Sequence, residues 1–306
     1  MTEYEGSTEV VVNFDSETDV DKQESIKQSI EALRERAHQL NSVRRATDMA
    51  VARATARPAE RRTVEIVADE ALIKEANDAL VLEQTTFLDA MTLDVTRPSN
   101  GQVPNLGGVF ANAASGGVEV FAIPFHYDWR WAVGSVVIDN TPDRPTGRIR
   151  ASAWGRRRCD AHAGFGVTVH SDRDHWMTAR SLRRSSESCR VKSGATGAVA
   201  LSEGGTEMTV MEGSTLLQVG QDKRFRVRKN PGFWSDPEEG SYDSGGFGVG
   251  NPIELTWFGL AGHNYQVNAG AWAFAEWTSG PHASGDISSA SGGIVADVLA
   301  ITVFHQ

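Results

Sequence analysis

Apolar residues recur at helical spacing near the start of the chain. They are separated by four, three, four and three positions, and they are Ile26, Ile30, Leu33, Ala37 and Leu40. This spacing is typical of a coiled-coil seam, which buries its apolar side chains against a partner helix. Asp19 or Asp21 can cap the helix, and Pro58 interrupts the pattern because proline lacks a backbone N–H. We predict a first helix over residues 21–56.

A second helix is expected over residues 60–84. The distribution of glycine supports a helical first part, since only Gly6 of the thirty glycines precedes residue 100. Glycine costs roughly 1 kcal/mol in a helix interior, so its absence permits long helices. We therefore assign residues 1–20 to a disordered acidic N-terminus and residues 21–97 to a helical arm or hairpin.

The remainder of the chain has the pattern of β-strands. Short segments rich in β-branched and aromatic residues are separated by Gly, Pro and Asp. The expected strands are 117–123, 132–138, 147–154, 164–170, 224–228, 265–277 and 294–304. The last two have apolar or small residues on both faces, which is typical of central strands. We predict an α+β protein, with an N-terminal helical, coiled-coil-like arm followed by an antiparallel, jelly-roll-like β-sandwich over residues 98–306.

The overall composition limits the classes of partner. Forty acidic and thirty basic residues give a net charge of −10, which disfavours extensive contact with nucleic acid. The N-terminal residues lack the basic and apolar regions of a secretory signal, and no apolar stretch approaches the roughly 20 residues of a membrane-spanning helix. The sequence leaves the location open between the cytoplasm and export by a non-classical route.

Basic residues are concentrated within the β region. Residues 143–192 contain twelve Lys or Arg and five Asp or Glu. Further along, Arg224, Arg226 and Arg228 alternate with apolar residues, so a regular strand would place the three guanidinium groups on one face. Together with the basic segment 143–192, such a face can bind phosphate, sulfate or carboxylate groups. Alternatively it pairs with the acidic first part, since residues 1–97 hold twenty acids and twelve bases.

Tryptophan supplies a second set of candidate binding residues. All eight Trp occur from Trp129 onward, and Trp129, Trp131 and Trp234 lie in segments expected to be loops or strand ends. Aromatic rings stack on sugars and settle at membrane interfaces. These three residues are therefore candidates for glycan or membrane contact, while the alternative for each is a place in the core.

Ser244 and His162 are the only residues that suggest a catalytic pair. Ser244 lies in Asp-Ser-Gly-Gly, a segment like the nucleophile turn of trypsin-like proteases, and His162 precedes it as in that family. However, Tyr242 stands where that turn has Gly, and the spacing is short for two six-stranded barrels. We therefore discount a serine hydrolase and expect a protein that is not an enzyme.

Cys159 and Cys189 are the only cysteines, too few for a disulfide scaffold. They can form one disulfide in an extracellular protein, or remain buried thiols in the cytosol. Together with His162, His170 and His175 they form a cluster of metal-binding side chains, but its spacing lacks the compact pairing of a zinc module. We predict no metal and no cofactor.

These features favour a non-enzymatic binding or structural protein. In this hypothesis residues 21–97 mediate assembly with a second copy or a protein partner, and the β-sandwich presents loops to a partner, a glycan or an anionic surface. The alternative is a membrane-active or pore-forming protein that acts through the β domain and amphipathic helices. The sequence does not identify the ligand, and nucleic acid is not an expected partner.

Overall fold

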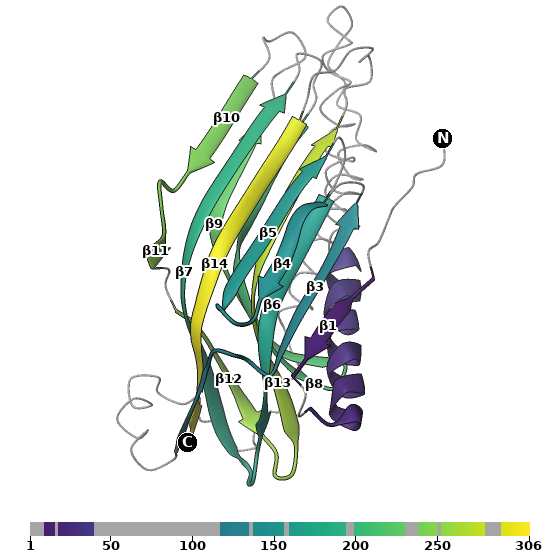
Figure 1. Ribbon diagram of the computed structural model, residues 1–306, viewed down its shortest axis with the longest axis vertical. Coiled ribbons are helices and arrows are strands. Elements are labelled where there is room, and N and C mark those ends of the chain that lie inside the picture. Colours follow the sequence, from purple (N-terminus) through teal and green to yellow (C-terminus); the bar gives the residue numbers. More distant parts are fainter. Residues whose placement is uncertain are drawn as a thin grey trace, which may run out of the picture.

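The computed structural model describes residues 9–15, 18–39, 117–134, 137–155, 159–193, 199–229, 238–249, 252–278 and 289–306. This part of the chain is mostly antiparallel β-sheet, with one short helix near the N-terminus (Figure 1). The predicted second helix and Trp234 lie outside the described residues. Two sheets pack against each other and share one hydrophobic core.

The first sheet has six strands in the order β1-β3-β6-β13-β8-β9. Their bounds are β1 (Val11–Phe14), β3 (Tyr127–Gly134), β6 (Cys159–His170), β13 (Asn264–Thr278), β8 (Val199–Glu212) and β9 (Thr215–Lys229). All neighbouring strands in this sheet are antiparallel. β8 and β9 form a hairpin, and Gly213 in its turn has a φ of +55°, which favours glycine because it has no Cβ.

The second sheet has eight strands, five of which lie side by side in the order β10-β7-β14-β5-β4 (Figure 1). In addition β11 and β12 pair with β7, and β2 pairs with β14. The bounds are β2 (Val118–Ala122), β4 (Val137–Asp143), β5 (Arg148–Gly155), β7 (His175–Ser193), β10 (Glu238–Asp243), β11 (Gly248–Val249), β12 (Ile253–Gly259) and β14 (Ser289–His305). β14 is central, since it pairs with β7 on one edge and with β5 and β2 on the other.

Small side chains make up much of the core between the sheets. Buried alanines of β5, β6, β13 and β14 contribute Ala151, Ala153, Ala163, Ala269, Ala271, Ala273, Ala275, Ala290 and Ala296. Phe225 is one of the larger rings, and a Cβ added to Gly204 or Gly292 would lie 2.5 Å or 2.9 Å from it. Protein interiors are close-packed, so these short residues on β13 and β14 allow the two sheets to approach each other.

The helix, residues 20–39, packs on the outer face of the six-stranded sheet. Ile26 and Ile30 are buried there against β3 aromatic side chains, and Leu33 and Ala37 pack beside them. The hydroxyl of Ser29 also donates to the carbonyl of Gly213 in the β8–β9 turn. The predicted coiled-coil seam is thus covered by strands of the same chain. Neither a coiled-coil arm nor an oligomer is shown.

Three further expectations differ from the structure. Residues 11–14 were expected to be disordered, but they form β1 and pair with β3. The predicted strand 132–138 combines the end of β3 with the start of β4, and β7 and β8 occupy segments in which no strand was predicted. The antiparallel β architecture is confirmed, and a sandwich fits the two packed sheets. A jelly-roll order is not shown.

Candidate functional site

A β-bulge divides the predicted arginine stripe on β9. Lys223 and Phe225 face consecutive residues of β8, so Arg224 between them has no opposite residue. A bulge redirects a side chain out of the regular alternation of the strand. Arg224 contacts a buried residue of β7, whereas Arg226 and Arg228 are exposed. The prediction that all three guanidinium groups share one face is therefore wrong.

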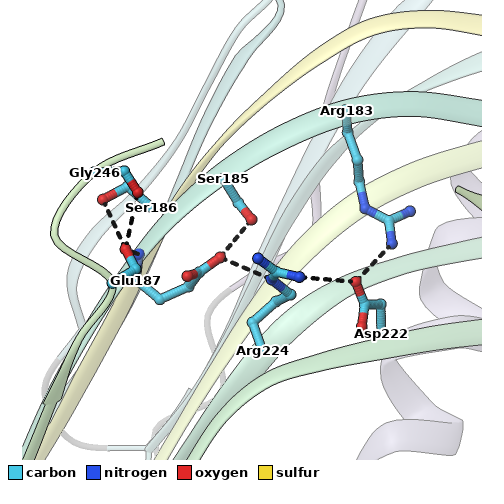
Figure 2. Close-up of polar contacts among 8 residues, drawn as sticks. Arg183, Ser185, Ser186, Glu187, Asp222, Arg224 and Gly246 are labelled. Atoms are coloured by element: carbon cyan, nitrogen blue, oxygen red, sulfur yellow. Dashed lines mark hydrogen bonds and ion pairs between the residues drawn. The ribbon is translucent and has the colours of Figure 1, made fainter. Parts of the chain in front are cut away.

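Arg224 belongs to a chain of alternating charges between the two sheets (Figure 2). Its Nε lies 3.1 Å from Glu187 Oε1, and its Nη1 lies 3.6 Å from Asp222 Oδ2. Arg183 donates to the same Asp222 oxygen at 3.3 Å, and Ser185 donates to Glu187. Burial lowers the pKa of Arg183, and Asp222 opposes this effect. Two cations and two anions thus balance, so this chain joins β9 to β7 without requiring an external anion.

Arg226 also has a partner within the sheets. Its Nε lies 3.5 Å from Glu203 Oε2, a carboxylate that Lys223 contacts at 3.0 Å. Arg224 and Arg226 thus both contact carboxylates that lie on β strands. Arg228 remains an exposed side chain at the end of the stripe.

Trp129 and Trp131 are core residues, each only 2% exposed. Trp129 lies over backbone that has no side chains, since a Cβ on Gly164 or Gly270 would come within 2.5 Å or 2.9 Å of its ring. The helix residues Ile26 and Ile30 pack in the same cluster. The interpretation of Trp129 and Trp131 as ligand platforms is therefore wrong.

His162 is buried on this same outer face of the six-stranded sheet. Its ring stacks on Trp131 with centroids 3.8 Å apart. Nδ1 lies 2.7 Å from Glu207 Oε1, and Nε2 lies 3.0 Å from Asp160 Oδ1. Burial lowers the pKa of His162, but the two carboxylates outweigh burial and raise it to about 10. Both nitrogens of the imidazolium are thus engaged by carboxylates.

Ser244 lies in the other sheet, in the turn that follows β10. Its hydroxyl donates to the carbonyl of Gly246 at 3.0 Å and accepts the backbone N–H of Glu187 at 3.0 Å. The structure therefore does not bring Ser244 and His162 together. The glycine-rich segment serves as a turn that is anchored to β7.

Cys159 and Cys189 are both buried thiols, and the candidate disulfide between them is not formed. They lie on different sheets, on β6 and β7. Burial raises the pKa of Cys189, while hydrogen bonds with Tyr242 backbone and Ser202 oppose the rise. Within the described ranges, no three His, Cys, Asp or Glu side chains are placed to hold a metal ion. No helix in the described part of the chain has the length and apolar character to cross a membrane.

The outer face of the eight-stranded sheet carries a surface that combines arginine with an exposed tryptophan. Pairing of β5, β14 and β7 aligns its side chains in four rows across the three strands. The rows are Trp154/Ser291/Arg190, Ser152/Gly293/Ser188, Arg150/Val295/Ser186 and Arg148/Asp297/Arg184. We call these twelve residues the arginine–tryptophan face. With a rise of roughly 3.3 Å per residue, the face is about 20 Å long.

Trp154 marks one end of this face and is 46% exposed. The positions next to it on β14, Ser291 and Gly293, have short side chains or none, so they do not cover the indole. On β7 the guanidinium of Arg190 lies 3.2 Å from Glu239. A cavity of about 410 Å³ adjoins this end and is lined by Arg190, Glu239, Gly240 and Ser241.

Asp297 organises the opposite end of the face. Its carboxylate accepts hydrogen bonds from Arg148 Nε and Arg184 Nε, each at 2.8 Å. Both guanidinium groups lie over the ring of Phe247, at 5.5 Å and 5.3 Å from its centroid. Burial raises the pKa of Asp297, but the two arginines outweigh burial and lower it. The turn that Ser244 holds thus places the ring of Phe247 against the guanidinium groups of Arg148 and Arg184.

The sequence of β5 contains the alternation that builds this face. Arg148, Arg150, Ser152 and Trp154 alternate with Ile149, Ala151 and Ala153. A period of two places the first set on one side of a strand and the apolar set on the other. Arg148 and Arg150 belong to the basic segment 143–192 that was proposed from the sequence as part of an anion-binding surface, whereas Trp154 was not among the predicted binding residues.

No protein-family model matches the chain, and no curated protein matches it. Among solved structures, TmCBM61 in complex with β-1,4-galactotriose is 10% identical, with a TM-score of 0.16, and the match covers 62% of this chain and 82% of that one. The glycoside hydrolase domain of Endo-D from Streptococcus pneumoniae R6 is 13% identical, with a TM-score of 0.16, over 48% of this chain and 22% of that one. The enzymatically active domain of tailspike protein 4 of bacteriophage CBA120 is 8% identical, with a TM-score of 0.14, over 56% and 20%. Likeness at these scores carries no argument about fold or function.

Proposed function

We propose that this protein is a non-enzymatic binding protein whose arginine–tryptophan face binds a glycan. The exposed indole of Trp154 is the observation that carries the proposal. An exposed aromatic ring offers an apolar surface to the C–H face of a sugar ring. The serine hydroxyls and guanidinium groups of the neighbouring rows supply hydrogen-bond partners for sugar hydroxyls. The length of about 20 Å suits an extended oligosaccharide rather than a single sugar.

The carboxylates of this face support binding rather than hydrolysis. A glycoside hydrolase needs a carboxylic acid whose raised pKa keeps it protonated. Here Arg148 and Arg184 hold the pKa of Asp297 below its ordinary value. Lys192 and Arg190 likewise lower the pKa of Glu239. Both groups remain ionised at neutral pH, so neither can act as a general acid.

Affinity gel electrophoresis with a panel of soluble polysaccharides tests this function. We expect at least one polysaccharide to retard the wild-type protein and the Trp154→Ala substitution to weaken that binding by about tenfold or more, because stacking is lost. Leu260→Ala is the matched control, since Leu260 is also an exposed apolar residue, 41% exposed, outside the face. Retardation that survives Trp154→Ala unchanged, or that falls equally in both variants, contradicts the proposal.

A further inference from the structure

We infer that the glycan bound by this face is acidic, carrying carboxylate or sulfate groups. This inference rests on the proposed function and concerns the chemistry of the ligand. The charge of the face supports an acidic ligand. The face and its flanking β7 and β10 side chains hold five cations, and they are Arg148, Arg150, Arg184, Arg190 and Lys192. Four carboxylates oppose them, and they are Asp297, Glu239, Asp243 and, opposite Arg148 on β4, Asp143, so the local net charge is +1 in a chain of net charge −10.

The arrangement of these cations is the second argument. Arg148 and Arg184 share the single carboxylate of Asp297, and their side chains are 42% and 49% exposed. Asp143 lies opposite Arg148 on β4, so Arg148 has a second carboxylate beside it, whereas Arg184 shares its Asp297 contact with Arg148. A guanidinium has five N–H groups, and Arg184 uses Nε on Asp297. Its remaining N–H groups can donate to a carboxylate or sulfate, whose oxygens arginine binds in a planar, two-point geometry.

The spacing of the two ends defines the ligand. Trp154 lies three rows from Arg184, which is about 20 Å along the strands. The rows between them contain residues with short side chains or none, such as Ser152, Ser188 and Gly293. A linear chain lying along the strands can therefore place one sugar ring on Trp154 and an acidic group against Arg148 and Arg184. Acidic groups repeated along the chain would also meet Arg150 and Arg190.

Single-stranded nucleic acid also combines rings with negative charge, but the face fits it less well. Proteins that bind such strands offer successive aromatic rings and a strongly positive groove. Here Asp243, Glu239 and Asp297 reduce the positive charge, and the two aromatic residues, Trp154 and Phe247, stand at opposite ends. Carboxylates can instead accept hydrogen bonds from sugar hydroxyls. The observations thus favour an acidic polysaccharide.

The experiment compares acidic polysaccharides with neutral forms of the same backbone. Polygalacturonate, alginate and chondroitin sulfate are each measured beside the carboxyl-reduced form, which for chondroitin sulfate is also desulfated, by calorimetry on the full chain. We expect at least one acidic form to bind about tenfold or more tightly than its neutral counterpart, and salt to weaken it because exposed charges are screened. If every polysaccharide that binds does so with equal affinity in its acidic and its neutral form, the inference of an acidic ligand is overturned. The proposal of glycan binding then still stands. Absence of binding to any form overturns both proposals.

Two substitutions test whether the arginines of the face recognise the acid. Arg190→Gln removes a side chain that is 71% exposed, so it should preserve the fold. It should weaken the binding of the acidic polysaccharide by about tenfold and that of the neutral form by less than threefold. Arg228→Gln makes the same change of charge on the other sheet and should leave both affinities unchanged. Equal losses in the two variants would show a general charge effect and overturn the site. Tighter binding of a single-stranded oligonucleotide than of every polysaccharide would assign the face to nucleic acid instead.

Discussion

His162 is a charged side chain kept inside the protein by two carboxylates and an aromatic ring. Asp160 and Glu207 each bond one of its ring nitrogens, and Trp131 covers its plane. Glu207 lies on β8 and His162 on β6, so their contact spans the intervening strand β13. The imidazolium thus joins two strands that are not neighbours in the sheet.

The charge on His162 predicts a pH dependence of stability. Its pKa is about 10 in the folded protein against 6.5 for an unperturbed histidine. A raised pKa stabilises the folded state fully below pH 6.5, and this contribution is lost as the pH rises from 6.5 to about 10. We expect the free energy of unfolding to fall by an amount on the order of a few kcal/mol over this range, measured by urea denaturation.

His162→Gln should remove most of this decrease in the free energy of unfolding between pH 6.5 and about 10. His170→Gln is the control because His170 is an exposed histidine on the same strand. A wild-type profile that is flat between these pH values, or one that His162→Gln leaves unchanged, would show that the imidazolium is not stabilised in the folded state.

The tryptophans show why single residues are hard to assign from sequence. Trp129 and Trp131 were expected at loops or strand ends, yet Trp129 is buried because Gly164 and Gly270 on neighbouring strands leave space for its ring. Trp154 has short neighbours too, but it lies on the outer face of the other sheet and remains exposed. Whether a tryptophan is buried or exposed depends on its neighbours across the strands. A sequence alone does not specify these neighbours, because it does not give the register of the strands.

Among the elements, the helix has the most regular sequence pattern. It packs on a β-sheet and not on the second helix that this pattern suggested. The spacing of Ile26, Ile30 and Leu33 identified the helix and its apolar face. It could not distinguish a second helix from a sheet, because either surface buries the same stripe. In the structure the aromatic residues of β3 take the place of the partner helix.

Ile26→Ala and Ile30→Ala should each destabilise the folded protein by roughly 2 to 5 kcal/mol, because both side chains are fully buried within this chain. Chemical denaturation measures this loss, and light scattering should show an unchanged molar mass. Val20→Ala is the control, since Val20 lies in the same helix and is 75% exposed. A lower molar mass without a loss of stability would instead place the seam between two copies of the chain.

The strands divide into those with a visible pattern and those without. β5, β13 and β14 were predicted because apolar or small residues mark their buried sides. β7 was not, since the middle of its inner face carries Ser181, Arg183, Ser185 and Glu187. Such a face has no hydrophobic periodicity. Its burial is explained by the opposite charges that β9 supplies in the folded protein. The bulge that turns Arg224 inward had no sequence signal that we recognised.

At the scale of the whole molecule, the charged chain of Figure 2 joins the two sheets. Arg224 and Asp222 come from the edge strand of one sheet, and Arg183 and Glu187 come from the other. Removing one partner of a buried ion pair leaves the other charge uncompensated, which costs more than the pair contributes. The contact therefore makes the relative position of the sheets sensitive to single substitutions.

Arg224→Gln should destabilise the protein by roughly 3 kcal/mol, because Glu187 is fully buried and would lose its cation. Arg228→Gln is the same change four residues along the same strand, at an exposed position, and should alter stability by less than about 0.5 kcal/mol. Thermal and urea denaturation of both variants measure the difference. Equal effects would mean that the chain of charges does not tie the sheets together.

The order of strands has a consequence for how the protein is made. β13 inserts between β6 and β8, and β14 inserts between β7 and the pair β5 and β2, so each follows in chain order every strand that it joins. During synthesis at roughly 5 to 20 residues per second, β14 emerges about 5 to 20 s after β8. Throughout that interval the earlier strands carry unpaired edges, which are prone to pair with other chains. The nascent polypeptide is therefore most prone to aggregation before its two central strands leave the ribosome.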